Sequence, residues 1–319
     1  MAATRFERQH LLPTAGAHPP TKAIRVPRGE FLFGYTVQQE WAWLISAAFF
    51  FGKVGAGAFL ISYFTHYYTG MVVGLLIVAV LKTTAHLLFL GRPLRAWRAV
   101  AKWRTSWISR GLLGVLVLLV AGFVYVSPAL GIGVLHKGSA VQAVFGVIAA
   151  LGAVDVMIYD GFVLKQSRGI PFWNTYLSPL LAIGYATLAG ITMTLVLQSI
   201  TLTHTSLGSL EGLEIALLAV NLVLIGLYVL TARTRGTAAQ AAAAMLTRGR
   251  LQALFLLVVG CLLATLVFAA VAIATGDVAF LAIAACCDLT GHFVVFFAVL
   301  RSGAYAPMRP PAGLGPVRY

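Results

Sequence analysis

Long apolar runs separated by short polar segments occupy most of this chain of 319 residues. A helix that crosses a bilayer needs about 20 predominantly apolar residues. Eight stretches reach that length, at residues 41–66, 71–90, 111–135, 141–164, 176–200, 212–232, 251–274 and 278–300. The pattern therefore predicts an all-α, polytopic membrane protein with eight transmembrane helices.

The predicted spans divide the chain into three regions. Residues 37–302 form a transmembrane domain, preceded by an extramembrane N-terminal arm (1–36) and followed by an extramembrane C-terminal tail (303–319). An even number of spans places both termini on one face of the membrane, which we call the N-face. The linkers are too short to hold a soluble domain, and the Ala-rich segment 237–246 is expected to extend a helix beyond the bilayer.

Composition agrees with a membrane protein. Apolar residues make up 60% of the chain and charged residues only 10%, whereas soluble domains have about 45–50% and about 25%. The net charge of +14 does not indicate nucleic-acid binding, because the basic residues gather in the linkers between apolar runs and form no Lys/Arg stripe with interleaved aromatic residues. Membrane lipid is the expected surrounding.

Basic residues are strongly biased to one face. The N-face segments carry 20 of the 23 Lys and Arg residues. Because cytoplasmic loops are enriched in Lys and Arg, the N-face is predicted to be the cytoplasmic face of the inner membrane. Alternatively, the basic residues form a docking surface for a partner subunit, and the orientation then does not follow from them.

The cysteines offer no metal site. Cys261, Cys286 and Cys287 all lie inside apolar runs, and their spacing fits neither an iron–sulfur cluster nor a zinc site. We expect no iron–sulfur cluster and no other metal centre in this chain.

A basic, aromatic segment follows the second span. It runs from Gly-Arg-Pro-Leu-Arg-Ala-Trp-Arg at 91–98 to Thr-Ser-Trp-Ile-Ser-Arg-Gly at 105–111. Its guanidinium groups can hold anions while its tryptophans anchor at the interface. A membrane-surface anchor is the simpler interpretation, but the prolines and serines between the charges favour a shaped loop.

Three motifs together resemble one family. They are the segment 91–111, the glycine-rich first span (Gly52, Gly55, Gly57), and Tyr159-Asp160-Gly161 running to Ile-Pro-Phe-Trp-Asn at 170–174. From about residue 35 to 300 the chain resembles the membrane subunits of polysulfide reductases, also called NrfD-like proteins. The resemblance implies eight spans in two four-helix bundles.

The resemblance also implies a function. Such subunits react with a quinone or quinol, here menaquinone or ubiquinone, and exchange electrons with a docked four-cluster iron–sulfur subunit that serves a molybdenum or tungsten pterin catalytic subunit. No haem is implied. The loop that faces the iron–sulfur protein matches 91–111, which assigns docking roles to Arg92, Arg95, Arg98, Trp107 and Arg110. The family tyrosine that binds the quinone headgroup corresponds to Tyr159.

The residues of span four support such a site independently. Asp155 and Tyr159 share one helical face at i,i+4, with Asp160 beside them near the N-face. A phenol and a carboxylate can exchange protons with a quinone. Otherwise Tyr159 is an ordinary interfacial tyrosine.

Span one supplies further candidates and one departure. It begins with Gln39, Glu40 and Trp43, polar and aromatic groups expected at the depth of Asp160. Polysulfide reductases carry an Asn and a His in the turns that follow, where this chain has Ile45 and Ala48. We therefore expect other headgroup contacts, from His86, Gln39 or Glu40.

Four ionisable residues lie deep in the spans, where an unpaired charge costs about 2.5–3.5 kcal/mol. They are Lys53, Lys82, Asp155 and Asp288, and we expect them to neutralise one another. Lys82 shares a helical face with His86, and Asp288 shares one with His292. These lines of titratable groups predict a proton route towards the N-face. The alternative is two structural ion pairs between helices.

Two other functions are compatible with the same residues. His86 and His292 could ligate a b-type haem, which would make the chain a haem anchor. Charges near the midplane are also typical of ion-coupled transporters. Against a transporter, the spans show no clear internal repeat and no helix broken by paired Gly and Pro residues.

Overall fold

The computed structural model describes residues 35–91, 93–132, 135–201 and 207–306. The predicted N-terminal arm and C-terminal tail lie almost entirely outside these ranges, so their boundaries stay a prediction. Within the described residues, eight helices are long and apolar enough to cross a membrane. This confirms the predicted all-α, eight-span fold, with span ends that differ from the sequence prediction by a few residues.

Five spans are single α-helices: α2 (Trp43–Phe64), α6 (Ala140–Gln166), α7 (Leu177–Ile200), α10 (Gln252–Thr275) and α11 (Val278–Arg301). The second span joins α3 (Tyr68–Leu76), the π-helical η1 (Ile77–Lys82) and α4 (Thr83–Leu90). The third joins α5 (Trp107–Val126) to η3 (Ser127–Leu130), and the sixth joins α8 (Leu207–Thr231) to η4 (Ala232–Thr234). Outside the spans lie β1 (Thr36–Val37), η2 (Pro93–Lys102), α9 (Thr237–Thr247) and β2 (Ala304–Tyr305).

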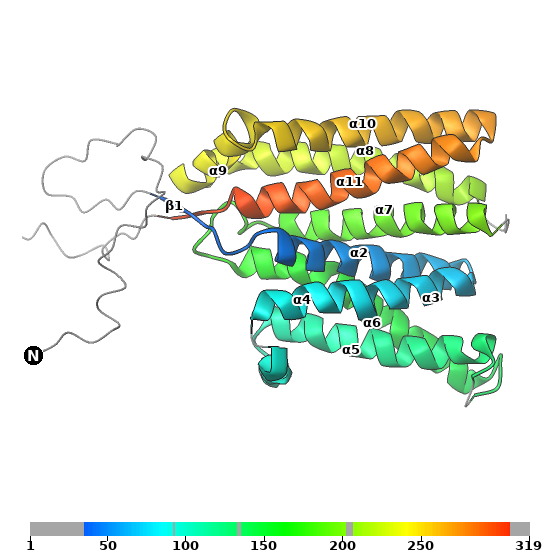
Figure 1. Cartoon of the computed structure of the whole chain (residues 1–319). Coiled ribbons are helices and arrows are strands. Elements are labelled where there is room, and N and C mark those ends of the chain that lie inside the picture. Colours follow the sequence, from blue (N-terminus) through cyan, green and yellow to red (C-terminus); the bar gives the residue numbers. More distant parts are fainter. Residues whose placement is uncertain (1–34, 92, 133–134, 202–206, 307–319) are drawn as a thin grey trace, which may run out of the picture. The chain divides into compact units, whose positions relative to one another are not determined.

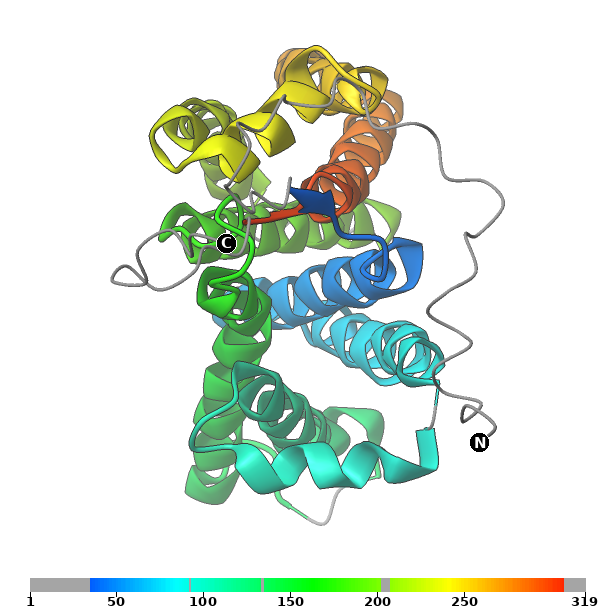
Figure 2. The ribbon, with the colours of Figure 1, turned by 90° about the vertical axis from the view of Figure 1, so that its left-hand side faces the viewer.

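The spans pack as two groups of four. The first bundle contains α2, α3–α4, α5 and α6, and the second contains α7, α8, α10 and α11, with α2 and α7 in extensive contact between them (Figures 1 and 2). Within an apolar stretch of 18 residues in each span, 78% of the residues are buried in α2 and 67% in α7. The corresponding share is 28% in the second, sixth and seventh spans. The joined α2–α7 pair is therefore the core, and the other three spans present most of their surface to lipid.

Small residues let α2 and α7 approach closely. A Cβ added at Gly57 would meet the Ala186 backbone and lie 3.1 Å from the Cα of Gly190, and one added at Gly190 would lie 2.8 Å from the Cα of Gly57. Small residues spaced by four are typical of close helix contacts in membranes. The contact between the two bundles thus depends on the absence of side chains at these positions.

The second span contains a feature that its apolar pattern does not predict. Its middle, Ile77–Lys82, is π-helical, and Lys82 is the last residue of that segment. The Thr83 hydroxyl donates to the Val78 carbonyl at 2.9 Å, which satisfies one carbonyl in the altered ladder. Single π-helical turns occur frequently at functional sites. Lys82, at the end of this segment, is therefore a candidate functional residue.

The prediction that segment 237–246 extends a transmembrane helix is wrong. The chain turns at Gly236, whose φ of +90° ends the helical path, and α9 is a separate helix. Its alanines 238, 239, 242 and 243 are buried, and α9 packs against α10 and β2 (Figure 2). Arg235 secures the turn by donating to the carbonyls of Phe172 (3.1 Å) and Tyr228 (2.9 Å). The positive φ at a glycine decided this turn.

The described chain ends are tied together at the N-face. β1 and β2 pair antiparallel, with Thr36 opposite Tyr305. The buried Gln38 side chain donates to the Leu300 carbonyl, and the Trp173 indole donates to the Val299 carbonyl at 2.9 Å. These bonds fix the entry of α2 beside the end of α11.

Candidate functional site

The centre of the first bundle holds a buried ion pair. The Lys53 ammonium of α2 contacts the Asp160 carboxylate of α6, and their side chains are 0% and 2% exposed. Asp160 also accepts a hydrogen bond from the Gly161 amide at 2.7 Å. The Lys53 ammonium lies 4.0 Å from the centre of the Phe296 ring of α11, so the pair is enclosed by elements of both bundles.

A second lysine lies beside this pair. The Lys82 ammonium donates to the Tyr159 hydroxyl at 3.2 Å, and both residues are buried. The Tyr159 ring packs edge-on against Phe49, with centroids 6.1 Å apart, and its other side faces Gly111 of α5. Phe49 also lies 5.6 Å from the Lys53 ammonium, so one aromatic ring lies next to both lysine pairs.

The two lysines of the site have one acid in direct contact. The stem of Lys82 lies against Gly52, where an added Cβ would come within 3.2 Å of its Cε atom. This brings Lys82 close enough to interact electrostatically with Lys53. Asp160 pairs with Lys53, whereas Lys82 contacts only the neutral Tyr159 hydroxyl among the described residues. A buried cation without an acid partner favours a ligand with electron-rich oxygens.

Two polar atoms beside Lys82 and Tyr159 lack partners. His86 follows Lys82 by one turn, and Asp155 precedes Tyr159 by one turn, packed against Gly114. The His86 Nδ1 and the Asp155 Oδ2 are buried and have no hydrogen-bond partner in the described part of the chain. Buried polar atoms are normally hydrogen-bonded, so these two mark the edges of a site that can bind a further polar group.

The residues at the start of α2 that were predicted to contact the quinone do not reach this site. Gln39 and Glu40 are exposed, and Trp43 is 61% exposed. Regular helix begins only at Trp43, so helical spacing could not orient the residues before it. Ile45 and Ala48, where the family has polar residues, are buried in the core.

Trp41, which belongs to the same run of polar and aromatic residues before the helix, is the tryptophan that faces inwards. It packs against Trp173, with centroids 5.4 Å apart, and against Phe49 and Phe89. It thus forms the N-face wall over the Phe49 ring.

The deep charges do not neutralise one another as expected. Lys53 pairs with Asp160, not with the deeper Asp155 or Asp288. A lysine stem carries its ammonium several ångströms from its Cα level, which explains why counting residues along the helix chose the wrong partner. Of the two expected ion pairs, the described residues contain this one.

Asp288 and His292 lie together in the second bundle. One Asp288 oxygen lies 3.0 Å from the Thr192 hydroxyl, which is itself 2.8 Å from Glu214. The His292 ring lies between Tyr185 and Phe50, with centroids 4.5 and 6.0 Å away. Glu214, only 1% exposed, was not predicted. The predicted proton route therefore falls into two clusters, one in each bundle.

The basic segment after the second span forms an exposed surface at the N-face. Arg95, Arg98 and Trp97 of η2 are exposed, with Trp97 at 70%. Arg110 instead donates to the carbonyls of residues 103 (3.0 Å) and 104 (2.8 Å), and Trp107 stacks on Phe162 at 4.1 Å. These two residues shape the loop, while the side chains of Arg95 and Arg98 are exposed, and Arg98 lies 5.5 Å from the centre of the Trp97 ring. Arg92 lies outside the described residues.

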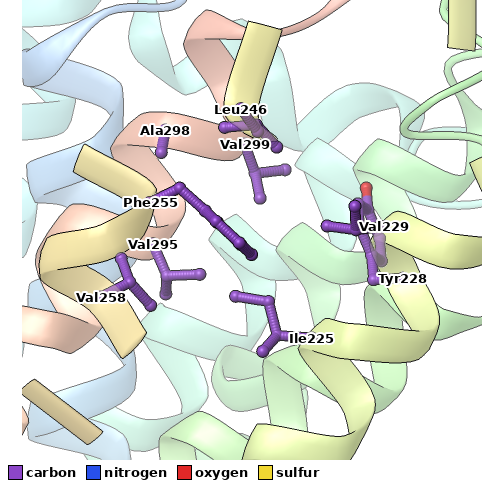
Figure 3. Close-up of a pocket in the computed structure, with 9 residues that line it drawn as sticks. All are labelled: Ile225, Tyr228, Val229, Leu246, Phe255, Val258, Val295, Ala298 and Val299. Atoms are coloured by element: carbon purple, nitrogen blue, oxygen red, sulfur yellow. The ribbon is translucent and has the colours of Figure 1, made fainter. Parts of the chain in front are cut away.

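A narrow apolar pocket opens in the second bundle between α8, α9, α10 and α11 (Figure 3). It is lined by Ile225, Tyr228, Val229, Leu246, Phe255, Val258, Val295, Ala298 and Val299. Its lining provides no charged group and no hydroxyl besides that of Tyr228. The pocket therefore lacks the donors that a redox-active headgroup needs, which the Lys82–Tyr159 site has.

Comparison with known proteins gives two findings. The family described as "Polysulphide reductase, NrfD" matches residues 34–307. One subunit of the sulfite dehydrogenase of Allochromatium vinosum is 30% identical over 126 residues, which is 35% of this chain and 36% of that protein. The match thus spans about a third of the relative's length. The family match includes the first span, segment 91–111 and Tyr159-Asp160-Gly161.

Proposed function

Because this chain belongs to the NrfD polysulphide reductase family, we propose that it is the quinone-reactive membrane subunit of a multi-subunit oxidoreductase. It exchanges electrons between menaquinone or ubiquinone and a docked iron–sulfur subunit, and it moves protons to or from the quinone. The observation that carries this proposal is the buried Lys82–Tyr159 pair, next to the Lys53–Asp160 ion pair.

The donors at this site suit a quinone headgroup. Each quinone carbonyl oxygen accepts hydrogen bonds, and Lys82 and Tyr159 offer an ammonium and a phenol. The partnerless Nδ1 of His86 is a third candidate donor. The quinone, when bound, supplies two-electron, two-proton redox chemistry. The residues of this chain supply charge, protons and exclusion of water.

Each residue has a role that follows from its position. The Lys82 ammonium stabilises negative charge on a headgroup oxygen, because charge interactions strengthen where water is excluded. Tyr159 holds the exchangeable proton at its hydroxyl and is oriented by Lys82 and Phe49. Asp155, one turn away with a free oxygen, is placed to accept or return that proton.

We propose that the partner subunit docks at the N-face. The exposed Arg95, Arg98 and Trp97 suit an acidic surface on a four-cluster iron–sulfur subunit, which in turn would serve a molybdenum or tungsten pterin subunit. The relative is itself named as one subunit of an enzyme, which is consistent with an assembly of several chains. We place the complex in the cell's inner membrane.

The test is Tyr159→Phe in the assembled complex. Loss of a positioned proton donor typically lowers the rate by about 10²–10⁴-fold, so quinone-linked turnover should fall by about 100-fold or more. The activity of the partner with a soluble dye should be unchanged. The control is Tyr176→Phe, which removes a hydroxyl from a side chain that is 72% exposed. Equal loss of quinone-linked and dye-linked activity would contradict the role of Tyr159.

Purification in mild detergent tests the assembly. An iron–sulfur protein, molybdenum or tungsten, and quinone should accompany the chain. Recovery of the chain alone, free of metal and quinone, would favour an ion-coupled transporter, and absorption in the Soret region assigned to this chain would favour a haem anchor.

A further inference from the structure

Buried polar side chains recur every seven residues on the facing sides of α7 and α8. On α7 they are Ser178, Tyr185 and Thr192, and on α8 they are Glu214, Asn221 and Tyr228; all six are at most 3% exposed. We call these six residues the polar seam. A seven-residue repeat keeps side chains on the contact line between two helices, where small or apolar residues are usual.

Two contacts fix the register of the seam. The Ser178 hydroxyl lies 3.4 Å from the Tyr228 hydroxyl, and the Thr192 hydroxyl lies 2.8 Å from Glu214. In this antiparallel register Tyr185 and Asn221 lie at the same level, midway between the two contacts. The Tyr185 hydroxyl and both polar atoms of Asn221 are buried without a hydrogen-bond partner in the described ranges.

Beyond the seam, towards the face opposite the N-face, α7 carries one further buried polar side chain. Gln198 is fully buried, and neither of its amide atoms has a partner among the described side chains and backbone. It follows Thr194 by one turn, and the Thr194 hydroxyl lies 3.2 Å from the Ser62 hydroxyl of α2, so Gln198 lies on the α2 side of α7 and outside the seven-residue repeat. The seam itself rises about 21 Å from Ser178 to Thr192, at 1.5 Å per residue.

At the end of the seam farthest from the N-face, one hydroxyl contacts two carboxyl groups. The Thr192 hydroxyl lies within hydrogen-bond distance of Glu214 Oε1 (2.8 Å) and Asp288 Oδ2 (3.0 Å). A hydroxyl has one hydrogen to donate, and an ionised carboxylate has none. Both contacts can be full, two-centre hydrogen bonds only if one of the two carboxyl groups carries a proton; otherwise the two carboxylates must share one hydrogen. Burial of both carboxyls, at 1% exposure, favours the same state.

The surroundings contain no cation in direct contact with these carboxyls among the described residues. Tyr185, Cys261 and Cys287 interact electrostatically with Asp288, and Glu211 does so with Glu214. These groups are neutral or acidic, so they cannot replace the proton.

Towards the first bundle, the seam approaches the lysine site. His292 lies one turn from Asp288, and both of its nitrogens are buried without a partner in the described structure. Its ring stacks on Phe296, with centroids 5.8 Å apart, and the Lys53 ammonium lies 4.0 Å from the centre of the same Phe296 ring. Lys53 in turn pairs with Asp160. The second bundle is therefore connected to the candidate quinone site through His292.

We propose that Glu214, Thr192 and Asp288 form a proton-binding site, and that the polar seam is a proton path between this site and the N-face. Glu214 and Asp288 share one proton through the Thr192 hydroxyl. Successive levels of the seam are about 10 Å apart, so the proton passes between levels through water held by the partnerless atoms of Tyr185 and Asn221. The coupling through His292 and the driving force for proton movement rest on the proposed quinone function.

Infrared spectroscopy of the purified complex at neutral pH tests the binding site without turnover. A protonated carboxylic acid absorbs apart from carboxylates, and this absorption should be lost or reduced in Glu214→Gln and Asp288→Asn. It should shift in Thr192→Val and return to its original position in Thr192→Ser. The control is Glu40→Gln, which changes an exposed carboxyl before the start of α2 and should leave it unchanged.

Two spectroscopic results would overturn the site. One is carboxylic acid absorption that is the same in the wild type, Glu214→Gln and Asp288→Asn. The other is wild-type absorption that disappears when sodium ions are added, because the two carboxyls would then hold Na⁺ in place of a proton.

Proton movement in vesicles tests the path. In complexes reconstituted into liposomes, Glu214→Gln and Asp288→Asn should lower the protons moved across the membrane per electron by about tenfold or more, while quinone-linked electron transfer continues. Unchanged proton movement in both variants, or none in the wild type, would overturn the path. An infrared signal that responds to Glu214→Gln and Asp288→Asn, together with unchanged quinone-linked turnover in Tyr159→Phe, would support the proton-binding site and contradict the quinone site. The reverse combination would contradict the proton-binding site alone.

Discussion

At the scale of single residues, two lysines share one acid in the centre of the first bundle. Asp160 compensates Lys53, and the Tyr159 hydroxyl and the Phe49 ring accommodate the neighbouring charges. Such a pair is expensive to bury, and it contributes less to stability than its Coulomb energy implies. It is therefore better explained by the site it positions than by stabilisation of the fold.

Variants of this pair should show strong coupling. Lys53→Met and Asp160→Asn each leave one buried group without its partner, which costs about 3–5 kcal/mol. The double variant removes both charges and should be destabilised by less than either single variant. Thermal denaturation in detergent of the wild type, both singles and the double measures this. Destabilisations that simply add would contradict a direct pair.

At the scale of elements, the contact between α2 and α7 depends on glycine. A side chain at Gly57 would meet the Ala186 backbone, which cannot move aside as a flexible side chain can. Gly260 on α10 has open space where a side chain would be added. The chain thus offers a matched pair of glycines, one inside a helix contact and one facing outwards.

Gly57→Val should prevent the two bundles from packing. We expect most of this variant to be lost as aggregate in size-exclusion chromatography after solubilisation, whereas Gly260→Val should elute as the wild type does. Equal, normal elution of both variants would show that the close approach of α2 and α7 is dispensable.

The η2 helix is the element that we assign to docking. Charges at the rim of an interface mainly change the rate of association and its dependence on salt. Arg95→Glu combined with Arg98→Glu should weaken association with the iron–sulfur subunit, most strongly at low ionic strength, without loss of the folded chain. Binding kinetics on immobilised complexes measure this, with Lys137→Glu on the opposite face as control. Equal effects of the two changes would place the docking surface elsewhere.

At the scale of the whole molecule, the bias of basic residues predicts the orientation. Gln166 is exposed at the N-face end of α6, and Lys137 is exposed on the opposite side of the bundle. If the N-face is cytoplasmic, a membrane-impermeant thiol reagent should label Lys137→Cys in intact cells and Gln166→Cys only after permeabilisation. The reverse pattern would show that the basic residues serve docking and do not set orientation.

The eight spans, their order and the grouping of basic residues on one face are all evident in the amino-acid sequence. The reason is that the bilayer requires long apolar runs, which can be recognised without any tertiary contact. The motifs 91–111 and Tyr159-Asp160-Gly161 also identified the family. The candidate residues Tyr159, Asp160, Lys82 and Lys53 could be named in advance because ionisable groups are rare within spans.

Which of these residues meet depends on how the helices pack. Lys53 pairs with Asp160 because its long side chain reaches that carboxylate. The positive φ of Gly236 separates α9 from the sixth span, and Trp41 faces inwards where Trp43 was expected. Glu214 became a candidate only when the register of α7 and α8 placed it on Thr192, beside Asp288 of α11. Hydropathy records how much of a helix is apolar, whereas partner choice depends on helix rotation, side-chain reach and close glycine contacts, which arise only on packing.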